Sequence, residues 1–262
     1  MIHPRTDAAQ KDWVRRVRDS LRARGYYYEP GFHSETCNAR YVVAAARLLG
    51  PLYVPPDTDS DRPVVLTRPS LTAPPWRPFD RRAAIGWHND FSTRSGRPEL
   101  SLSWIRRGDP AGPTGGAWRV ASASAVLAKL RQTREGTRLA TELSERAEAF
   151  GYRDAGRWYP FRVVAGAYRG SDRRGLRFYG RALEEGARLR FGKVPDRTRE
   201  IVARIQGAAD AVGEALPART GALLIVDNRF SLHDRAEQQV AGPGECRRQA
   251  WLCFVKRLHE PL

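Results

Sequence analysis

Seven short apolar segments follow one another between residues 83 and 255, each bounded by glycine, proline or polar turn residues. Their apolar residues either alternate with polar ones or run without interruption, which is the pattern of half-buried and fully buried β-strands. Such a series favours a β-sandwich or barrel over a doubly wound α/β sheet. The segments that predict strands are 83–87, 100–105, 118–121, 161–168, 176–179, 222–226 and 248–255.

Helical patterns surround these segments. Apolar residues at helical spacing, ended by a glycine, predict two helices before the strands, and amphipathic patterns predict two longer helices between them. The predicted helices are 8–24, 36–49, 123–150 and 197–216, and a further short strand is predicted at 64–66. The fold class that follows is mainly β with flanking helices.

The length of the chain and its cysteines limit what kind of protein it can be. A chain of 262 residues with 41% hydrophobic residues can bury one core, so we expect a single domain over residues 1–262. The longest aliphatic run, residues 222–226, is far shorter than the about 20 residues of a membrane helix, and no apolar signal segment precedes it. Cys37, Cys246 and Cys253 are odd in number and lack zinc-site spacing. We therefore expect a soluble protein of the reducing cytoplasm, without a membrane partner.

The formal charge of +16 requires an anionic partner or another explanation. Nucleic acid is the first candidate for a surface of this sign. However, only four of the 45 basic residues are lysines, and the arginines are spread between acidic residues along the chain. This distribution argues against a nucleic-acid partner. An anionic small-molecule substrate, or one tethered to an acidic carrier, would use the same charge, and the sequence gives no indication of oligomeric state.

Two of the five histidines lie at the ends of predicted strands. In the stretch GWHNDFS, His88 and Asp90 are two residues apart, which on a strand places both side chains on one face. That pair alone is typical of an ordinary polar contact. The later stretch VDNRFSLH ends at His233. If the two strand ends meet, two imidazoles and one carboxylate would occupy one face of an octahedral metal, the arrangement that leaves three positions open on Fe(II).

Four motifs together resemble one family. GWHNDFS, GGAWRVAS, VDNRFSLH and RRQAWLCFV are similar, in order and spacing over residues 80 to 255, to the motifs of the taurine dioxygenase and clavaminate synthase-like group of Fe(II)/2-oxoglutarate-dependent oxygenases. The resemblance implies a double-stranded β-helix (jelly roll, cupin-like). Its core would span 80–257 with helical insertions, after a helical N-terminal segment at 1–50.

The resemblance also implies an activity and its ligands. His88, Asp90 and His233 match the iron ligands, and the cosubstrates would be 2-oxoglutarate and O2. The reaction would couple decarboxylation of 2-oxoglutarate to hydroxylation or desaturation of a small molecule, as in natural product biosynthesis. Because Asp90 keeps a carboxylate on the metal, halogenation is disfavoured.

A basic residue after the distal histidine would bind the far carboxylate of 2-oxoglutarate. Arginine suits this task because its planar fork donates two parallel hydrogen bonds. Arg248 is the first candidate, in phase with an apolar strand face, and Arg247 is the alternative on the opposite face. The family's threonine after the GG pair falls here on Trp118, which leaves Thr114 or Ser122 to make that contact.

Substrate contacts are expected next to the ligands. By position, the candidates are Trp87, Asn89 and Arg235. Two other functions are left open by the residues alone. One is a basic nucleic-acid-binding protein in which His88 and Asp90 are a structural pair, and the other is a cupin-like metalloenzyme that does not use 2-oxoglutarate.

Overall fold

The computed structural model describes residues 7–32, 38–55, 63–70, 72–73, 78–94, 96–152, 156–167, 173–239 and 248–258. Its helices are α1 (Asp7–Arg24), α2 (Ala39–Leu49), α3 (Ala123–Leu130), α4 (Arg134–Glu145), α5 (Gly180–Phe191) and α6 (Asp196–Val212), with a 3-10 turn at Pro78–Asp80. Its strands are β1 (Tyr26–Glu29), β2 (Leu52–Tyr53), β3 (Val64–Thr67), β4 (Leu100–Arg107), β5 (Trp118–Ser122), β6 (Ala147–Tyr152), β7 (Arg157–Arg162), β8 (Val164–Ala167), β9 (Arg174–Leu176), β10 (Glu214–Leu216), β11 (Leu223–Asp227), β12 (Ser231–Arg235) and β13 (Gln249–Val255).

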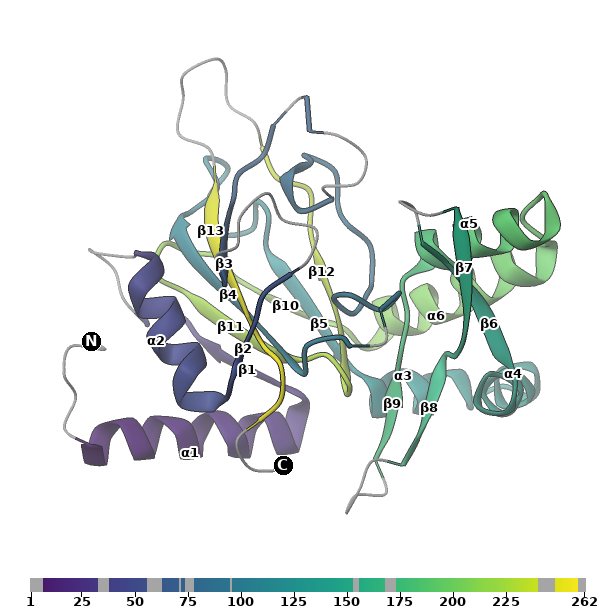
Figure 1. Ribbon diagram of the computed structural model, residues 1–262, viewed down its shortest axis with the longest axis horizontal. Coiled ribbons are helices and arrows are strands. Elements are labelled where there is room, and N and C mark those ends of the chain that lie inside the picture. Colours follow the sequence, from purple (N-terminus) through teal and green to yellow (C-terminus); the bar gives the residue numbers. More distant parts are fainter. Residues whose placement is uncertain are drawn as a thin grey trace.

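Two antiparallel sheets form the body of the molecule (Figure 1). The larger sheet has the order β1-β11-β4-β13-β2, with β3 also paired to β13, and the smaller sheet has the order β10-β5-β12. The fold is therefore a mixture of helices and strands with antiparallel sheets. Helices make a larger contribution than the predicted mainly β class implied.

Strand β11 explains the unbroken apolar run in its sequence. Leu223 and Ile225 pack with the residues of α1 and α2, whereas Leu224 and Val226 pack with residues of the smaller sheet. Successive side chains of a strand point to opposite faces, so a strand covered on both sides needs apolar residues at every position. The two layers of core thus meet at this strand.

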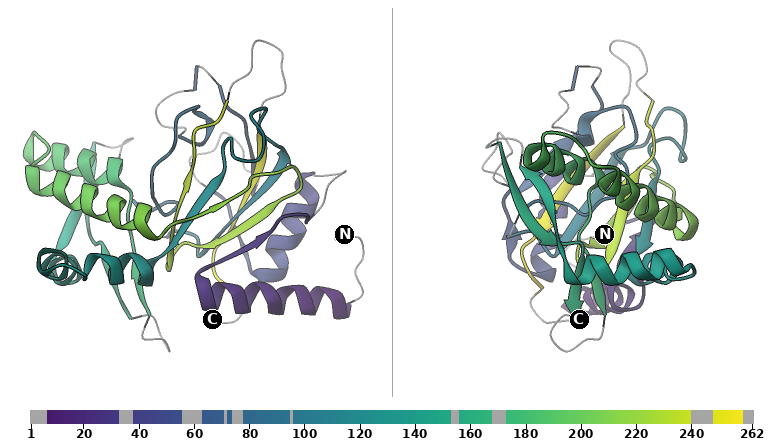
Figure 2. Two further views of the ribbon diagram at one scale, coloured as in Figure 1. Left: turned by 180° about the vertical axis from the view of Figure 1, so that it is seen from behind. Right: turned by 90° about the vertical axis from the view of Figure 1, so that its right-hand side faces the viewer.

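Helices α1 and α2 lie together on the outer face of the larger sheet (Figure 2). The buried residues of α1 are Trp13, Val17 and Leu21, which form one stripe at helical spacing. Gly25 follows α1 with a φ of 83°, a left-handed conformation that favours glycine and turns the chain directly into β1. None of the described helices is long and apolar enough to cross a lipid bilayer.

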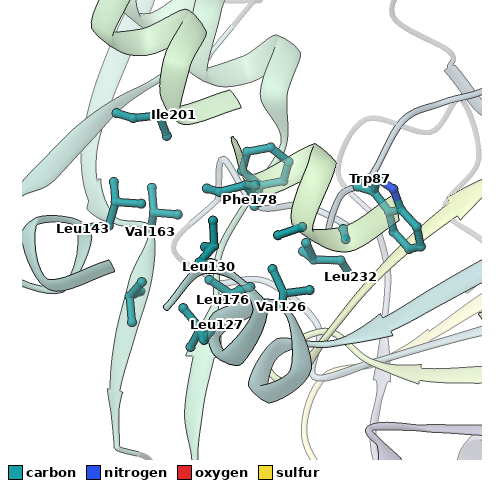
Figure 3. Packing of buried hydrophobic residues seen from close by; sticks show 14 of the residues in the cluster. Trp87, Val126, Leu127, Leu130, Leu143, Val163, Leu176, Phe178, Ile201 and Leu232 are labelled. Carbon is teal, nitrogen blue, oxygen red and sulfur yellow. The ribbon is translucent and has the colours of Figure 1, made fainter. Parts of the chain in front are cut away.

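Helices α3 to α6 and the hairpins β6-β7 and β8-β9 form a separate lobe beside the sheets (Figure 1). Its apolar core joins the helices to the sheet body, because it includes Trp87 and Leu232 together with Phe178 and Ile201 (Figure 3). Helix α5 packs closely on β6 at Gly186, where a Cβ atom would lie 2.4 Å from the carbonyl oxygen of Ala149. Glycine is therefore required at this contact.

Most differences between the predicted elements and the structure lie in and near this lobe, although strands β1 and β2 of the larger sheet were not predicted either. The helix predicted over 123–150 is wrong as a single element, because it is divided into α3, α4 and strand β6. The side chain of Thr133 accepts a hydrogen bond from the backbone N–H of Gly136, which starts a new helix. The predicted strand 83–87 is not formed, helix α5 was not predicted, and residues 214–216, predicted as helix, form β10.

The reactivity of Cys253 can be used to test how strand β13 packs. Its side chain is fully buried, and burial raises the pKa of its thiol to about 12. Because the thiolate is the reactive form, we expect iodoacetamide at pH 8 to leave Cys253 unmodified in the folded protein and to label it in urea. Mass spectrometry of the peptide measures this, and rapid labelling without denaturant would contradict the packing. Cys37 and Cys246 lie outside the described residues.

Candidate metal centre

His88 and His233 meet across two segments that are far apart in the sequence. They form an isolated antiparallel bridge, in which each backbone N–H donates to the carbonyl oxygen of the other at 2.9 Å. The centroids of the two imidazole rings are 4.3 Å apart. The predicted convergence of the two strand ends is therefore present, although only His233 lies within a regular strand.

Asp90 lies between the two imidazoles. Its Oδ1 is 3.6 Å from Nε2 of His88 and its Oδ2 is 3.4 Å from Nε2 of His233. One possible ligand atom from each of the three residues lies within 4.8 Å of the others. The backbone N–H of Asp90 donates to Oδ1 of Asn228 at 3.3 Å, which ties the loop of Asp90 to the turn before β12.

The hydrogen bonds of His88 determine which nitrogen faces the centre. Its Nδ1 lies 2.8 Å from the carbonyl oxygen of Gly86. Because a carbonyl only accepts, Nδ1 carries a proton, and in the neutral imidazole Nε2 is the nitrogen that can bind a metal. In His233, Nε2 likewise faces Asp90, and the buried Nδ1 has no hydrogen-bond partner among the described residues. The Nε2 atoms of both histidines therefore face the centre, on the side of Asp90.

Electrostatics favours an ionised carboxylate at this centre. Burial alone would raise the pKa of Asp90, but His233 and His88 outweigh it and hold that pKa well below its usual value. Two neutral imidazole nitrogens and one carboxylate oxygen form the ligand set typical of non-haem Fe(II), whereas a structural zinc site is closed by four ligands. The side chains present therefore fit an iron ion.

Arg248 is a buried cation close to the smaller sheet. Its side chain is 3% exposed, and its Nε has no hydrogen-bond partner in the described part of the chain. Burial, together with the positive charge of Arg235, lowers the pKa of Arg248 to about 9. Gly116 of the GGAW motif makes room for it, because a Cβ atom there would lie 2.7 Å from its Cδ. The site would be stabilised by an anion placed against this guanidinium.

The other residues expected to bind 2-oxoglutarate lie in different surroundings. Thr114 is exposed in the turn before β5. Ser122 caps helix α3, with its hydroxyl accepting a hydrogen bond from the backbone N–H of Ala125. Arg247 lies outside the described residues.

Trp87, Asn89 and Arg235, the expected substrate contacts, each have contacts within the protein. Trp87 is 2% exposed in the core of the lobe, and Arg235 donates to backbone carbonyls, including those of Arg81 and Ala83. Asn89 donates to the carbonyl oxygen of Ser231 at 2.6 Å and accepts from the N–H of Phe178 at 2.8 Å. The hydrogen bonds of Asn89 and Arg235 satisfy buried backbone groups, which need partners inside the protein.

We expect Asn89→Ala to lower the free energy of unfolding by about 2–6 kcal/mol, since two buried backbone groups lose their partners. Urea denaturation followed by circular dichroism measures this. The control is Ser144→Ala near the end of α4, which removes only an exposed hydrogen bond from the Ser144 hydroxyl to the carbonyl oxygen of Thr141. Equal midpoints for Asn89→Ala and the control would contradict this role of Asn89.

Two residues of the centre were not singled out from the sequence. Asn228 holds the backbone of Asp90 and also donates to Oγ of Ser101 at 2.7 Å. The ring of Tyr179 lies 5.6 Å from that of His88. The Asp-Asn pair before β12 was a visible signal for Asn228, whereas nothing in the pattern around Tyr179 marks its proximity to His88.

Comparisons with known proteins agree with this geometry. A model of the family described as "Taurine catabolism dioxygenase TauD, TfdA family" matches residues 4–253. No curated protein matches the sequence.

Solved structures share the fold at low sequence identity. An asparagine oxygenase in complex with Fe(II), hydroxyasparagine and succinate has a TM-score of 0.72 and 19% identity, covering 94% of this chain and 80% of that one. The non-haem iron oxygenase OrfP, in complex with Fe and alpha-ketoglutaric acid, has a TM-score of 0.67 and 14% identity, over 95% and 79% of the two chains. A taurine dioxygenase from Burkholderia xenovorans has a TM-score of 0.67 and 14% identity, over 93% and 81%.

Proposed function

This chain belongs to the TauD, TfdA family of dioxygenases, and from that premise we propose that it is an Fe(II)/2-oxoglutarate-dependent oxygenase acting on a small molecule. The convergence of His88, Asp90 and His233 is the observation that carries the proposal. Family membership favours this function over a nucleic-acid-binding protein and over a metalloenzyme that does not use 2-oxoglutarate.

The three side chains would hold the metal through Nε2 of each histidine and a carboxylate oxygen of Asp90. Iron bound there would supply the oxygen chemistry, coupled to conversion of 2-oxoglutarate into succinate and carbon dioxide. The protein contributes the geometry and the exclusion of water. His88 is 8% exposed, whereas the side chain of Asp90 is 25% exposed, so the centre is accessible on the side of Asp90.

Arg248 would bind the far carboxylate of 2-oxoglutarate. A buried guanidinium whose pKa is lowered by burial gains most from a carboxylate, because the anion offsets the cost of keeping the charge out of water. The ring centroid of Trp118 lies 5.8 Å from the guanidinium carbon of Arg248, so the indole limits the positions that the guanidinium can take. Arg247 is the alternative, and Thr114 is kept as a further candidate contact.

The two sheets would be the halves of a double-stranded β-helix with the iron at its mouth. Residues 1–262 would form one oxygenase domain, with the jelly-roll core at 80–257 and the lobe inserted in it. The solved structures with the same fold support this assignment, since they are iron oxygenases.

The substrate would be a small molecule, and the charge of +16 supports an anionic or carrier-bound one. The asparagine oxygenase is described with a hydroxylated amino acid, which supports hydroxylation here. Natural product biosynthesis is the setting that we propose.

The deciding experiment measures succinate by mass spectrometry after incubation with Fe(II), 2-oxoglutarate and O2, with a panel of amino acids and acidic metabolites. We expect succinate only when all three are present, and an increase with a true substrate. Succinate formation that is independent of Fe(II), or no formation together with no binding of 2-oxoglutarate, would contradict the proposal.

A further inference from the structure

An ion-pair network around one buried carboxylate lies on the side of β12 that faces the lobe. Asp234 follows the proposed ligand His233 directly and is fully buried. Because neighbouring residues of a strand point to opposite faces, the carboxylate of Asp234 points away from the metal centre. It is therefore not placed to be a metal ligand itself, although it lies close enough to His88 for its charge to raise the pKa of that imidazole.

The carboxylate of Asp234 reaches the centre through Gly86. Its Oδ1 accepts the backbone N–H of Gly86 at 2.8 Å, and the carbonyl of the same glycine accepts the Nδ1 proton of His88 at 2.8 Å. Gly86 has a φ of 88°, a conformation that other residues rarely adopt. Gly86 therefore connects Asp234 to His88 through its backbone N–H and its carbonyl, so a shift of Asp234 would change the orientation of the imidazole.

Arg119 holds Asp234 in place. It lies directly opposite Asp234 in the pairing of β5 with β12. Its Nε donates to Oδ2 of Asp234 at 3.0 Å, and its Nη2 donates to the same oxygen. Its Nη1 donates to Oδ1 of Asp210 at 2.8 Å, which is on α6. The same oxygen of Asp210 accepts the indole N–H of Trp87 at 2.8 Å, and Arg119 stacks 4.8 Å above that indole.

We propose that Asp234, Arg119 and Asp210 are positioning residues that fix the orientation of the His88 imidazole for metal binding. This inference rests on the proposed metal centre. The network ties three parts of the molecule to one histidine: the smaller sheet, the lobe through α6, and the loop before His88. Hydrogen bonds that orient a ligand contribute to metal affinity, and their loss typically costs about 10–100-fold.

The test compares two arginines whose side chains are about equally exposed and that each pair with two carboxylates. Arg119 has a side chain 36% exposed and pairs with two carboxylates, Asp210 and Asp234. Arg197 has a side chain 38% exposed and pairs with Glu142 and Glu200 in the lobe. Among the described contacts, only the Arg119 network leads to His88. Each arginine is replaced by methionine, and Co(II) binding to the metal-free protein is measured by calorimetry without 2-oxoglutarate.

We expect Arg119→Met to weaken Co(II) binding by about 10–100-fold, while Arg197→Met stays within about twofold of the wild type. Thermal melting of each metal-free variant is measured first. If Arg119→Met does not fold, Arg119→Lys, which keeps the charge and one bond to Asp234, replaces it with a smaller loss expected. Asp234→Asn should weaken Co(II) binding in the same direction.

Folded Arg119 and Asp234 variants that bind Co(II) as tightly as the wild type would overturn this inference and leave the metal centre intact. An equal loss in Arg197→Met would also overturn it, because the effect would then be one of general stability. A wild-type protein that does not bind Co(II) would instead overturn the metal centre itself.

Discussion

Replacing Asp90 by alanine is expected to abolish succinate formation and to remove tight metal binding. Asp90 supplies the only carboxylate among the three proposed ligands, and its pKa is held well below the usual value, so it is charged at neutral pH. Metal-based stabilisation of a reaction amounts to several kcal/mol, so activity should fall by about a thousandfold or more. The readouts are succinate by mass spectrometry and bound iron by a colorimetric assay after gel filtration.

The matched control for this substitution is Asp196→Ala at the start of α6. It removes the same charge from a fully exposed position, where the side chain is 100% exposed. We expect this variant to keep its iron and its activity. Succinate formation by Asp90→Ala at the wild-type rate would refute the ligand assignment.

Replacing Arg248 by methionine is expected to prevent binding of 2-oxoglutarate without harming the fold. Removing one partner of a buried charge pair costs about 2–5 kcal/mol, which corresponds to a dissociation constant raised by roughly 30-fold to several thousandfold. In contrast, the ligand-free protein should melt at the same or a higher temperature, because methionine fills similar space and carries no buried charge. These two opposite effects separate a binding role from a structural one.

Melting curves with and without 2-oxoglutarate measure both effects. A ligand at 100 times its dissociation constant stabilises the folded state by about 2.7 kcal/mol, so the wild type should shift clearly and Arg248→Met should not. Arg197→Met, the same substitution in the lobe, is the control and should show the shift of the wild type. A normal shift in Arg248→Met would move the assignment to Arg247 or another residue.

The sequence predicted those parts of the molecule in which the local pattern of apolar and polar residues is compatible with only one kind of structure. The apolar run of β11 and the helical stripe of α1 each lie where the pattern places them. His88, Asp90 and His233 were found because their residue types limit the chemistry, and the structure brings them together. Arg248 is buried, as the phase of the last strand predicted.

The failures arise where distant parts of the chain decide the outcome. Helix α5 has glycine at its first position and another at Gly186, which weakens its local signal, yet the close approach of β6 requires that second glycine. Strand β6 forms by pairing with β7, and its sequence by itself fits the continuing helix that we predicted. The hydrogen bonds of Asn89 to Ser231 and of Trp87 to Asp210 could not be predicted either, because they join segments that are far apart in the sequence.

Strand β11 lies between β1 and β4, which come from distant stretches of the chain, and β13 pairs with β4 on its other side. Contacts of such long sequence separation are slow to form, because a large loop must close before any of them is made. The bridge between His88 and His233 depends on the same closure. The three proposed ligands therefore come together only when this long-range pairing has formed, so a metal bound there would stabilise the folded chain.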